Sequence, residues 1–269
     1  MNILLNLFPG GLHKALTFSY DDGRTQDRKL VDLFNRHRLK ATFHLNSGKF
    51  DEDGYVKYEE VARLYAGHEV SAHTVTHPFL ERIPRERLMM EVLDDRGALE
   101  ELTGYPVRGM SYPYGAYTEE VADAIGSLGI RYCRTVHSTG TFTVPQRPLT
   151  WHPTCHHKQM KEHGEAFLAL DPPPHYANLA LLYVWGHSYE FDNDGNWNEI
   201  EEFCATFAGR SDIWYATNIE IADYLEALRR LEFSVGGTLV RNPSAGSVWI
   251  TANGEAVEIA GGETKRLDG

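Results

Sequence analysis

The stretch Leu16-Thr17-Phe18-Ser19-Tyr20-Asp21-Asp22-Gly23 decides how the rest of the chain is interpreted. The apolar run 15–18 predicts a buried strand that ends in two adjacent carboxylates and a glycine. In folds of alternating parallel strands and helices, ligands bind at the carboxyl ends of the strands. A surface turn is the alternative, because Asp and Gly favour turns for backbone reasons. The choice between a turn and a site depends on what other strands bring to the same place.

The composition indicates a globular protein with a sizeable core and an acidic surface. The 269 residues are 42% hydrophobic, and the formal net charge is −12. Nucleic acid and anionic membrane surfaces would repel this charge, so neither is expected as a partner. The three cysteines, Cys133, Cys155 and Cys204, are odd in number and widely spaced, which is typical of a reducing compartment and does not describe a disulfide framework.

The N-terminal stretch 1–9 is apolar but lacks the basic region and the cleavage site of a signal peptide, so it predicts a first strand. No stretch reaches the roughly 18 to 20 apolar residues that span a bilayer. We therefore expect a cytoplasmic protein without a membrane partner. The oligomeric state has no signal in the sequence.

Strands and helices alternate along most of the chain. Strands are predicted at 41–45, 69–72, 108–112, 130–136, 179–185 and 213–216. Helices are predicted at 25–39, 59–65, 84–102, 118–128, 200–207 and 219–231. The stretch 138–176 is rich in Pro and His and too long for a simple connection, which indicates a functional loop or an insertion. The alternation predicts an α/β fold.

The pattern changes after residue 232 to short β-type runs broken by glycine and asparagine. Asn253-Gly254 is a strong hairpin signal between the runs 248–251 and 256–259. We expect a main domain over residues 1–231 and a small antiparallel β appendage over residues 232–269.

A pair of histidines provides the partners that the two aspartates need. His73 and His77 follow the predicted strand 69–72, and on a helical turn an i, i+4 spacing brings two imidazoles close enough to share a metal. His152 and His156 have the same spacing, next to His157 and Cys155, and are a rival pair that could form a second site. The first pair is favoured as ligands, because it directly follows a strand, as Asp22 does, whereas the rival lies in irregular chain.

Four motifs then stand in the order and approximate spacing of a known family: 17–23, 73–77, 112–115 and 185–187. Over about residues 14–228 the chain resembles the polysaccharide deacetylases, the NodB-homology domain of carbohydrate esterase family four. The resemblance implies a distorted, incomplete (β/α) barrel. It also implies removal of N- or O-acetyl groups from sugars with a divalent metal, with zinc as the first expectation and cobalt, nickel or another divalent ion as alternatives.

The resemblance also implies roles for individual residues. The metal ligands would be Asp22, His73 and His77, and the general base and general acid would be Asp21 and His187. The residues expected to bind substrate are Tyr114, Trp185 and Arg134, with the backbone N–H of Tyr114 as the donor to the oxyanion. A metal held by one Asp and two His leaves open positions for water and substrate, as a hydrolytic site needs.

Two departures from the family pattern affect the base and the acid. The family has an arginine two residues before the proline of the third motif, where this chain has Ser111. Arg134 is a candidate replacement cation and Arg108 a poorer one. The family's fourth motif, whose aspartate orients the acidic histidine, is also not evident. Glu190, Asp192 and Asp194 follow His187 and would either tune the pKa of that histidine or cap a loop.

The leading hypothesis is therefore a metal-dependent hydrolase of a carbon–nitrogen or ester bond that deacetylates an N-acetylated sugar or oligosaccharide. An amidase or imidase acting on a small cyclic amide or ureide is the second hypothesis. A carbohydrate-binding relative without turnover is the third, and the presence of both a base and an acid beside the ligands argues against it. The expected partner is a carbohydrate or a small N-acylated substrate.

Overall fold

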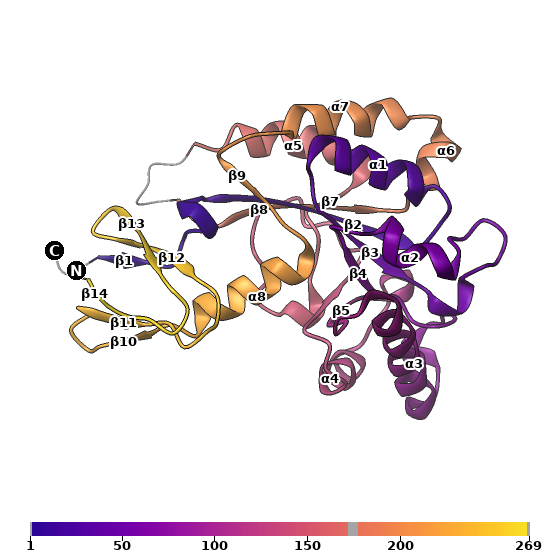
Figure 1. The fold of residues 1–269 in the computed structure, drawn as a ribbon, viewed down its shortest axis with the longest axis horizontal. Coiled ribbons are helices and arrows are strands. Elements are labelled where there is room, and N and C mark those ends of the chain that lie inside the picture. Colours follow the sequence, from indigo (N-terminus) through magenta and orange to yellow (C-terminus); the bar gives the residue numbers. More distant parts are fainter. Residues whose placement is uncertain (1, 172–176, 268–269) are drawn as a thin grey trace.

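The computed structural model describes residues 2–171 and 177–267. Parts of the predicted first strand, of the irregular stretch and of the appendage fall on Met1, 172–176 and 268–269, which lie outside the described residues. A parallel sheet dominates the fold and curls into an incomplete barrel (Figure 1). Its strands are β2 (Lys14–Asp22), β3 (Ala41–Leu45), β4 (Glu69–Ala72), β5 (Gly109–Ser111), β6 (Tyr132–Arg134), β7 (Cys155–His156), β8 (Ala180–Gly186) and β9 (Ile213–Tyr215). The fold class predicted from the sequence is confirmed.

Strand order explains how distant segments meet at one edge. The order is β6-β5-β4-β3-β2-β8-β7, with β9 pairing beside the first half of β2. All these pairings are parallel. Residues 151–156 connect the β6 end of the curled sheet to its β8 end. The Trp151 amide donates to the carbonyl oxygen of Cys133 in β6, and the Thr154 amide donates to that of Tyr183 in β8. The carboxyl ends of the strands therefore gather at one end of the barrel.

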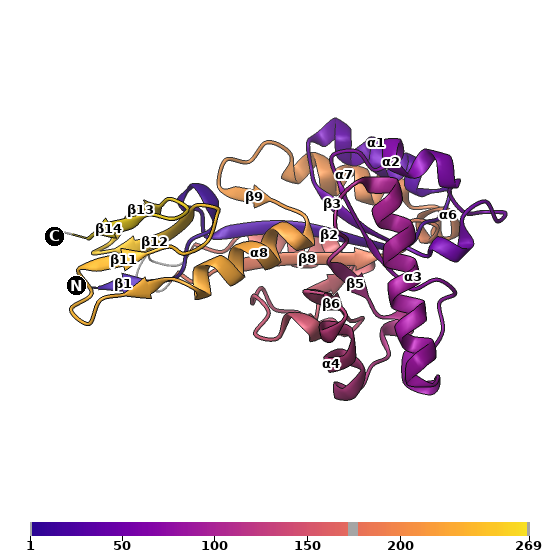
Figure 2. The ribbon, with the colours of Figure 1, turned by 60° about the horizontal axis from the view of Figure 1, so that its bottom comes forward.

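The helices cover the outside of the sheet in two groups, with α1, α5 and α7 in one and α3 and α4 in the other (Figures 1 and 2). Their bounds are α1 (Asp27–His37), α2 (Val61–Leu64), α3 (Arg85–Thr103), α4 (Glu119–Ser127), α5 (Met160–Leu168), α6 (Glu190–Asp194), α7 (Trp197–Phe207) and α8 (Asn218–Arg229). Among the described helices, none combines the length and the apolar character needed to cross a lipid bilayer.

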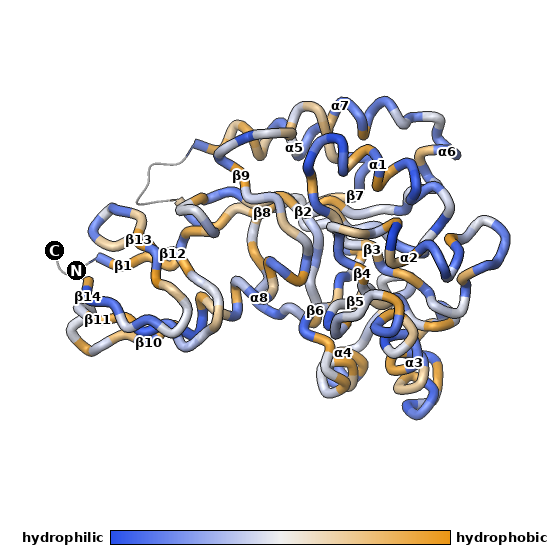
Figure 3. Tube along the Cα trace, viewed as in Figure 1, coloured by the Kyte–Doolittle hydropathy of each residue, from blue (hydrophilic) through white to orange (hydrophobic). Residues whose placement is uncertain are grey.

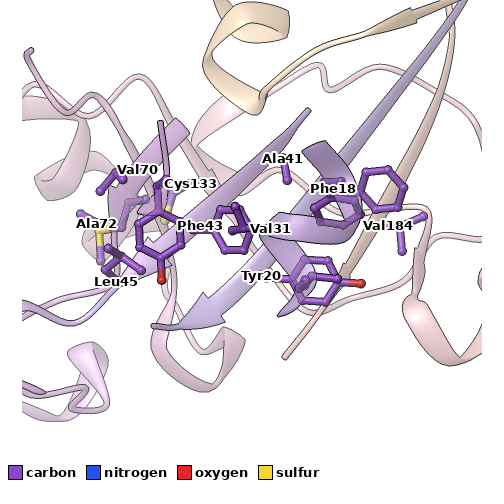
Figure 4. Close-up of a cluster of buried hydrophobic side chains, with 14 of the residues drawn as sticks. Phe18, Tyr20, Val31, Ala41, Phe43, Leu45, Val70, Ala72, Cys133 and Val184 are labelled. Atoms are coloured by element: carbon purple, nitrogen blue, oxygen red, sulfur yellow. The ribbon is translucent and has the colours of Figure 1, made fainter. Parts of the chain in front are cut away.

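The core lies between the sheet and these helices. Figure 4 shows the β2 and β3 side chains Phe18, Tyr20 and Phe43 gathered with Val31 of α1. Phe18 and Phe34 have ring centroids 4.6 Å apart. Figure 3 shows hydrophilic and hydrophobic residues mixed along α1 and α3, as expected of helices that bury one face. Burial of these large apolar side chains is the dominant stabilising contribution.

The antiparallel strands form two small sheets beside the barrel. One contains β1 (Ile3–Leu4), β12 (Val248–Ala252) and β13 (Glu255–Ile259), and the other contains β10 (Glu232–Phe233), β11 (Leu239–Arg241) and β14 (Thr264–Arg266). The hairpin at Asn253-Gly254 forms where it was expected, with positive φ at both residues, as its turn requires. The division of the chain at residue 231 stays a prediction.

Two sequence expectations about local structure hold only in part. The N-terminal stretch is a strand only at Ile3–Leu4, and this strand pairs with β12 in the appendage sheet. The irregular stretch 138–176 contains β7 and the helix α5. Gly164 has a low helix propensity, so the sequence gives little sign of this helix. The glycine is needed for packing, because Phe203 of α7 lies only 2.6 Å from where a Cβ of residue 164 would stand. Packing against α7 therefore decides the conformation of this segment.

Candidate active site

The barrel edge at the strand ends collects the polar residues that the sequence singled out. Asp21 and Asp22 end β2, His73 directly follows β4, and His187 directly follows β8. Ser111 and Arg134 end the neighbouring strands β5 and β6. Because the strands are parallel, all of these side chains reach the same end of the barrel.

Asp22, His73 and His77 place their ligand atoms within 4.8 Å of one another. Asp22 Oδ1 is 3.7 Å from His73 Nε2 and 3.8 Å from His77 Nε2. His73 Nδ1 lies 2.9 Å from the carbonyl oxygen of Ser111, and a proton shared there leaves the Nε2 lone pair facing Asp22. One carboxylate and two imidazoles are a donor set that binds divalent transition metals. The residues present therefore fit a metal.

The two imidazoles meet through a strained loop, and the helical turn expected from the i, i+4 spacing was wrong. Residues 73–77 are not helical, and Thr74 and His77 have φ angles of 70° and 60°. Asp22 and Tyr114 also have positive φ, at 80° and 58°. Such angles are unfavourable for residues with side chains and cluster at functional sites. The ring centroids of the histidines are nevertheless 4.7 Å apart.

Helix α3 holds this loop through two buried carboxylates. Asp95 accepts hydrogen bonds from the backbone amides of His73 at 2.9 Å and Ser47 at 2.7 Å. Glu91 accepts from both the amide and the hydroxyl of Thr76. Sequence reasoning missed both acids. The available signal was an i, i+4 acidic pair on the same face as the apolar residues of α3.

Asp21 is held by a buried cation and by a hydroxyl. The Arg134 guanidinium donates to Asp21 Oδ2, and Ser111 Oγ donates to Asp21 Oδ1 at 3.1 Å. Burial alone would raise the pKa of Asp21, but Arg134 and His73 hold it well below its usual range. The carboxylate is therefore ionised at neutral pH. Arg134 is fully buried and also contacts Ser19 and the Thr135 carbonyl.

His187 interacts with the carboxylates of Asp21, Asp22 and Glu190. Burial lowers its pKa, but the carboxylates of Glu190, Asp21 and Asp22 outweigh burial, and the net shift is upward. Glu190 Oε2 accepts the backbone amide of His187 at 3.3 Å and lies 3.6 Å from its Nδ1. The protonated imidazole is therefore favoured at a higher pH than in free histidine.

Residues 11–133 match the sequence model of the family described as polysaccharide deacetylase. The resemblance to the polysaccharide deacetylases is confirmed for this segment. Over 117 residues the chain is 33% identical to the peptidoglycan-N-acetylglucosamine deacetylase PgdA of Listeria monocytogenes, covering 42% of this chain and 24% of the relative. Over 125 residues it is 32% identical to the chitooligosaccharide deacetylase of a Bradyrhizobium strain, covering 44% of this chain and 53% of the relative.

The chain thus spans about a quarter to a half of the length of these deacetylases. Solved structures extend the likeness in fold beyond the matched segment. A candidate polysaccharide deacetylase of Mycobacterium smegmatis aligns with a TM-score of 0.61 at 16% identity, over 82% of this chain and 93% of that one. The Xyl-CE4 domain of a xylanase from the hindgut metagenome of Trinervitermes trinervoides aligns with a TM-score of 0.56 at 15% identity, over 80% and 92%.

The matched segment, residues 11–133, contains the two aspartates, the two histidines and the third motif, but it stops before Arg134 and His187. Tyr114 is 55% exposed, with its ring stacked on Phe79 at 3.9 Å and 4.4 Å from the ring of His77. Trp185 is mostly buried, under the Arg134 guanidinium and beside His187. Substrate contacts of Tyr114, Trp185 and Arg134 stay predictions.

The rival histidine pair is not brought together. His152 Nδ1 is bonded to the Thr135 hydroxyl, whereas His156 joins His157 and Glu190 in a second group of potential ligands. Of the residues that the sequence suggested for a second site, His156 and His157 are in this group and His152 is not. The poorer replacement cation, Arg108, forms a two-bond ion pair with Asp223 and does not contact Asp21.

Proposed function

We propose that this protein is a zinc-dependent hydrolase that removes the acetyl group from the nitrogen of an N-acetylated sugar or oligosaccharide. The observation that carries the proposal is the position of Asp21. Its carboxylate is fixed by Arg134 and Ser111 beside a three-residue ligand set, while His187 faces the same carboxylates from β8. The whole protein's activity is inferred, because the similarity covers only about a quarter to a half of the length of these relatives.

Asp22, His73 and His77 would hold the metal. When bound there, a divalent ion supplies Lewis acidity for the acetyl carbonyl and lowers the pKa of a water. Asp21 accepts a proton from the attacking water as the new carbon–oxygen bond forms. Ser111 donates to one carboxylate oxygen of Asp21 and Arg134 donates to the other, and these two bonds fix the orientation of the base.

His187 donates its proton to the nitrogen as the carbon–nitrogen bond breaks, so that acetate and a free amine leave. Glu190 is proposed to position this imidazole, in place of the aspartate of the family's fourth motif. The backbone N–H of Tyr114 is proposed to donate to the developing oxyanion. The exposed Tyr114 ring and its partner Phe79 offer an aromatic surface for the apolar face of a sugar ring.

The test measures acetate release by zinc- or cobalt-loaded protein from N-acetylglucosamine, chitooligosaccharides and peptidoglycan fragments. Asp21→Asn and His187→Gln are the inactive variants, and the exposed Asp53→Asn is the matched control. We expect release by the wild type and the control, with losses of 100-fold or more in the two variants, in the range of lost general acid–base catalysis. Wild-type protein with bound metal that releases no acetate from any of these substrates would contradict the proposal.

A further inference from the structure

A second group of potential metal ligands lies beside His187, through Glu190. His156 ends β7, His157 follows it, and Glu190 begins α6. Glu190 Oε2 is 3.0 Å from His156 Nε2 and 3.3 Å from His157 Nε2, and the three ligand atoms lie within 4.8 Å of one another. None of these residues is needed to hold the metal at the first site.

His157 is the unusual member of this group. Its side chain is 1% exposed, yet neither ring nitrogen has a hydrogen-bond partner. A buried polar group without a partner is costly and rare in native proteins. The ring is fixed between Phe191, stacked at 4.3 Å, and Tyr20 at 5.9 Å. Its Nδ1 lies 2.1 Å from where a Cβ of residue 186 would stand, so only glycine fits there.

The spacing of the donor atoms suits a shared cation. Bond lengths of 2.0–2.2 Å in tetrahedral geometry place two ligand atoms of a zinc ion about 3.4 Å apart. The His157–Glu190 separation of 3.3 Å is close to this value, but the Nε2 atom makes no hydrogen bond to the carboxylate. A short distance without a hydrogen bond between the two atoms is expected when both atoms point at the same metal position.

An ion pair between Glu190 and His156 is the simpler interpretation of the cluster. It accounts for the 3.0 Å contact of His156, but it leaves both nitrogens of His157 without a partner. A cation between the three side chains satisfies the His157 Nε2 atom as well. Binding has a cost, because a proton on His156 Nδ1 displaces the 3.3 Å hydrogen bond that this atom accepts from the Lys158 amide.

We propose that His156, His157 and Glu190 form a second binding site for a divalent transition metal, weaker than the site at Asp22. Two imidazoles and a carboxylate select zinc, cobalt, nickel or copper over magnesium or calcium. The same Glu190 oxygen contacts His187. If His187 is the general acid of the proposed function, a metal at the second site binds Glu190 and weakens its interaction with the His187 imidazole. Excess metal then inhibits the reaction.

Cobalt titration of metal-free protein tests the site, with equilibrium dialysis for stoichiometry and visible absorption for coordination. We expect two bound equivalents in the wild type and one in His156→Gln and in His73→Ala. The double variant should bind none. His152→Gln is the matched control, because His152 has the spacing of the rival pair but bonds Thr135 outside the cluster, and it should keep two equivalents.

One equivalent in the wild type, or two in His156→Gln, would overturn the second site. Since the His156 side chain is partly exposed, circular dichroism of His156→Gln should match that of the wild type. In the activity assay, excess zinc should inhibit the wild type and His152→Gln at least ten-fold more strongly than His156→Gln. The two proposals can fail separately, because stoichiometry reports on the site even if no acetylated sugar is a substrate.

Discussion

Ser111 and Arg134 are paired residues of the neighbouring strands β5 and β6, and both donate to the carboxylate of Asp21. The family pattern has an arginine at the position of Ser111. In this chain the cation stands one strand further along at the same level of the barrel. The hydroxyl of Ser111 fills the space in between and also contacts His73 Nδ1 at 2.7 Å. Asp21, the proposed base, therefore keeps a cationic partner although the arginine of the family motif is absent.

Replacing Arg134 by glutamine should destabilise the protein strongly, because it leaves the buried Asp21 carboxylate without its cation. Breaking one side of a buried ion pair costs about 3 to 5 kcal/mol. Urea unfolding of metal-free protein measures this loss. The double variant Asp21→Asn/Arg134→Gln has no unpaired charge and should recover at least half of the lost free energy. A loss below about 1 kcal/mol in Arg134→Gln would show that the pair is not coupled as described.

Asp95→Asn should weaken metal binding, because an amide cannot accept from the backbone amides of both His73 and Ser47 without presenting its own N–H to one of them. Loss of such an outer partner typically lowers metal affinity 10- to 100-fold. Competition with a chromogenic chelator measures the change in Kd. Asp94→Asn is the matched control on the exposed face of α3 and should keep wild-type affinity. Equal affinities in the two variants would remove Asp95 from its supporting role.

The strand pattern could be predicted because apolar runs, glycines and helix caps are local signals. Strands β3 and β4 begin and end at the predicted residues, and Asp22 and His73 follow from the rule that parallel strands present their ends together. Pairing across strands is not local. That Arg134 stands opposite Ser111 depends on sheet register, so the sequence offered Arg134 only as one of two candidates.

Helix α5 and the contact of His157 with Glu190 were missed for a related reason. Helix α5 contains a glycine, which weakens its sequence signal, and it is stabilised by packing against α7. His157 contacts Glu190, which is 33 positions away in the chain. The i, i+4 spacing of His73 and His77 did identify a real pair, but through a loop geometry that spacing does not encode. A resemblance to known motifs was therefore more informative for the site than periodicity.

Tyr114→Ala should weaken substrate binding more than turnover. The aromatic ring is more than half exposed and stacks on Phe79, while the proposed oxyanion donor is the backbone N–H, which alanine retains. We expect KM for a chitooligosaccharide to rise about ten-fold, as loss of roughly 1.4 kcal/mol of ring contact would give, with kcat within three-fold. Tyr58→Ala, another exposed tyrosine, is the control. A fall in kcat with unchanged KM would point instead to a disturbed loop.

Glu69→Gln should change how stability depends on pH. Glu69 is buried at the start of β4, where it accepts hydrogen bonds from Thr42, Tyr132 and the Ile219 amide. Burial raises its pKa from 4.5 to about 7, although these hydrogen bonds oppose the shift. Between these two pH values the carboxyl group ionises only in the unfolded chain. The free energy of unfolding therefore falls as pH rises from about 4.5 to 7, by about 3 kcal/mol for this group, and then levels off.

Glutamine keeps acceptors for Thr42 and Ile219 but does not ionise, so the variant should lose this contribution to the slope. Urea unfolding of chelator-treated protein between pH 5 and 8 measures it. A slope remains from Asp27 and Asp95, whose pKa values burial also raises to about 7. The exposed Glu59→Gln is the control and should follow the wild type. Parallel curves for Glu69→Gln and the wild type would mean that Glu69 has the same pKa in the folded and unfolded chain, and would contradict the prediction.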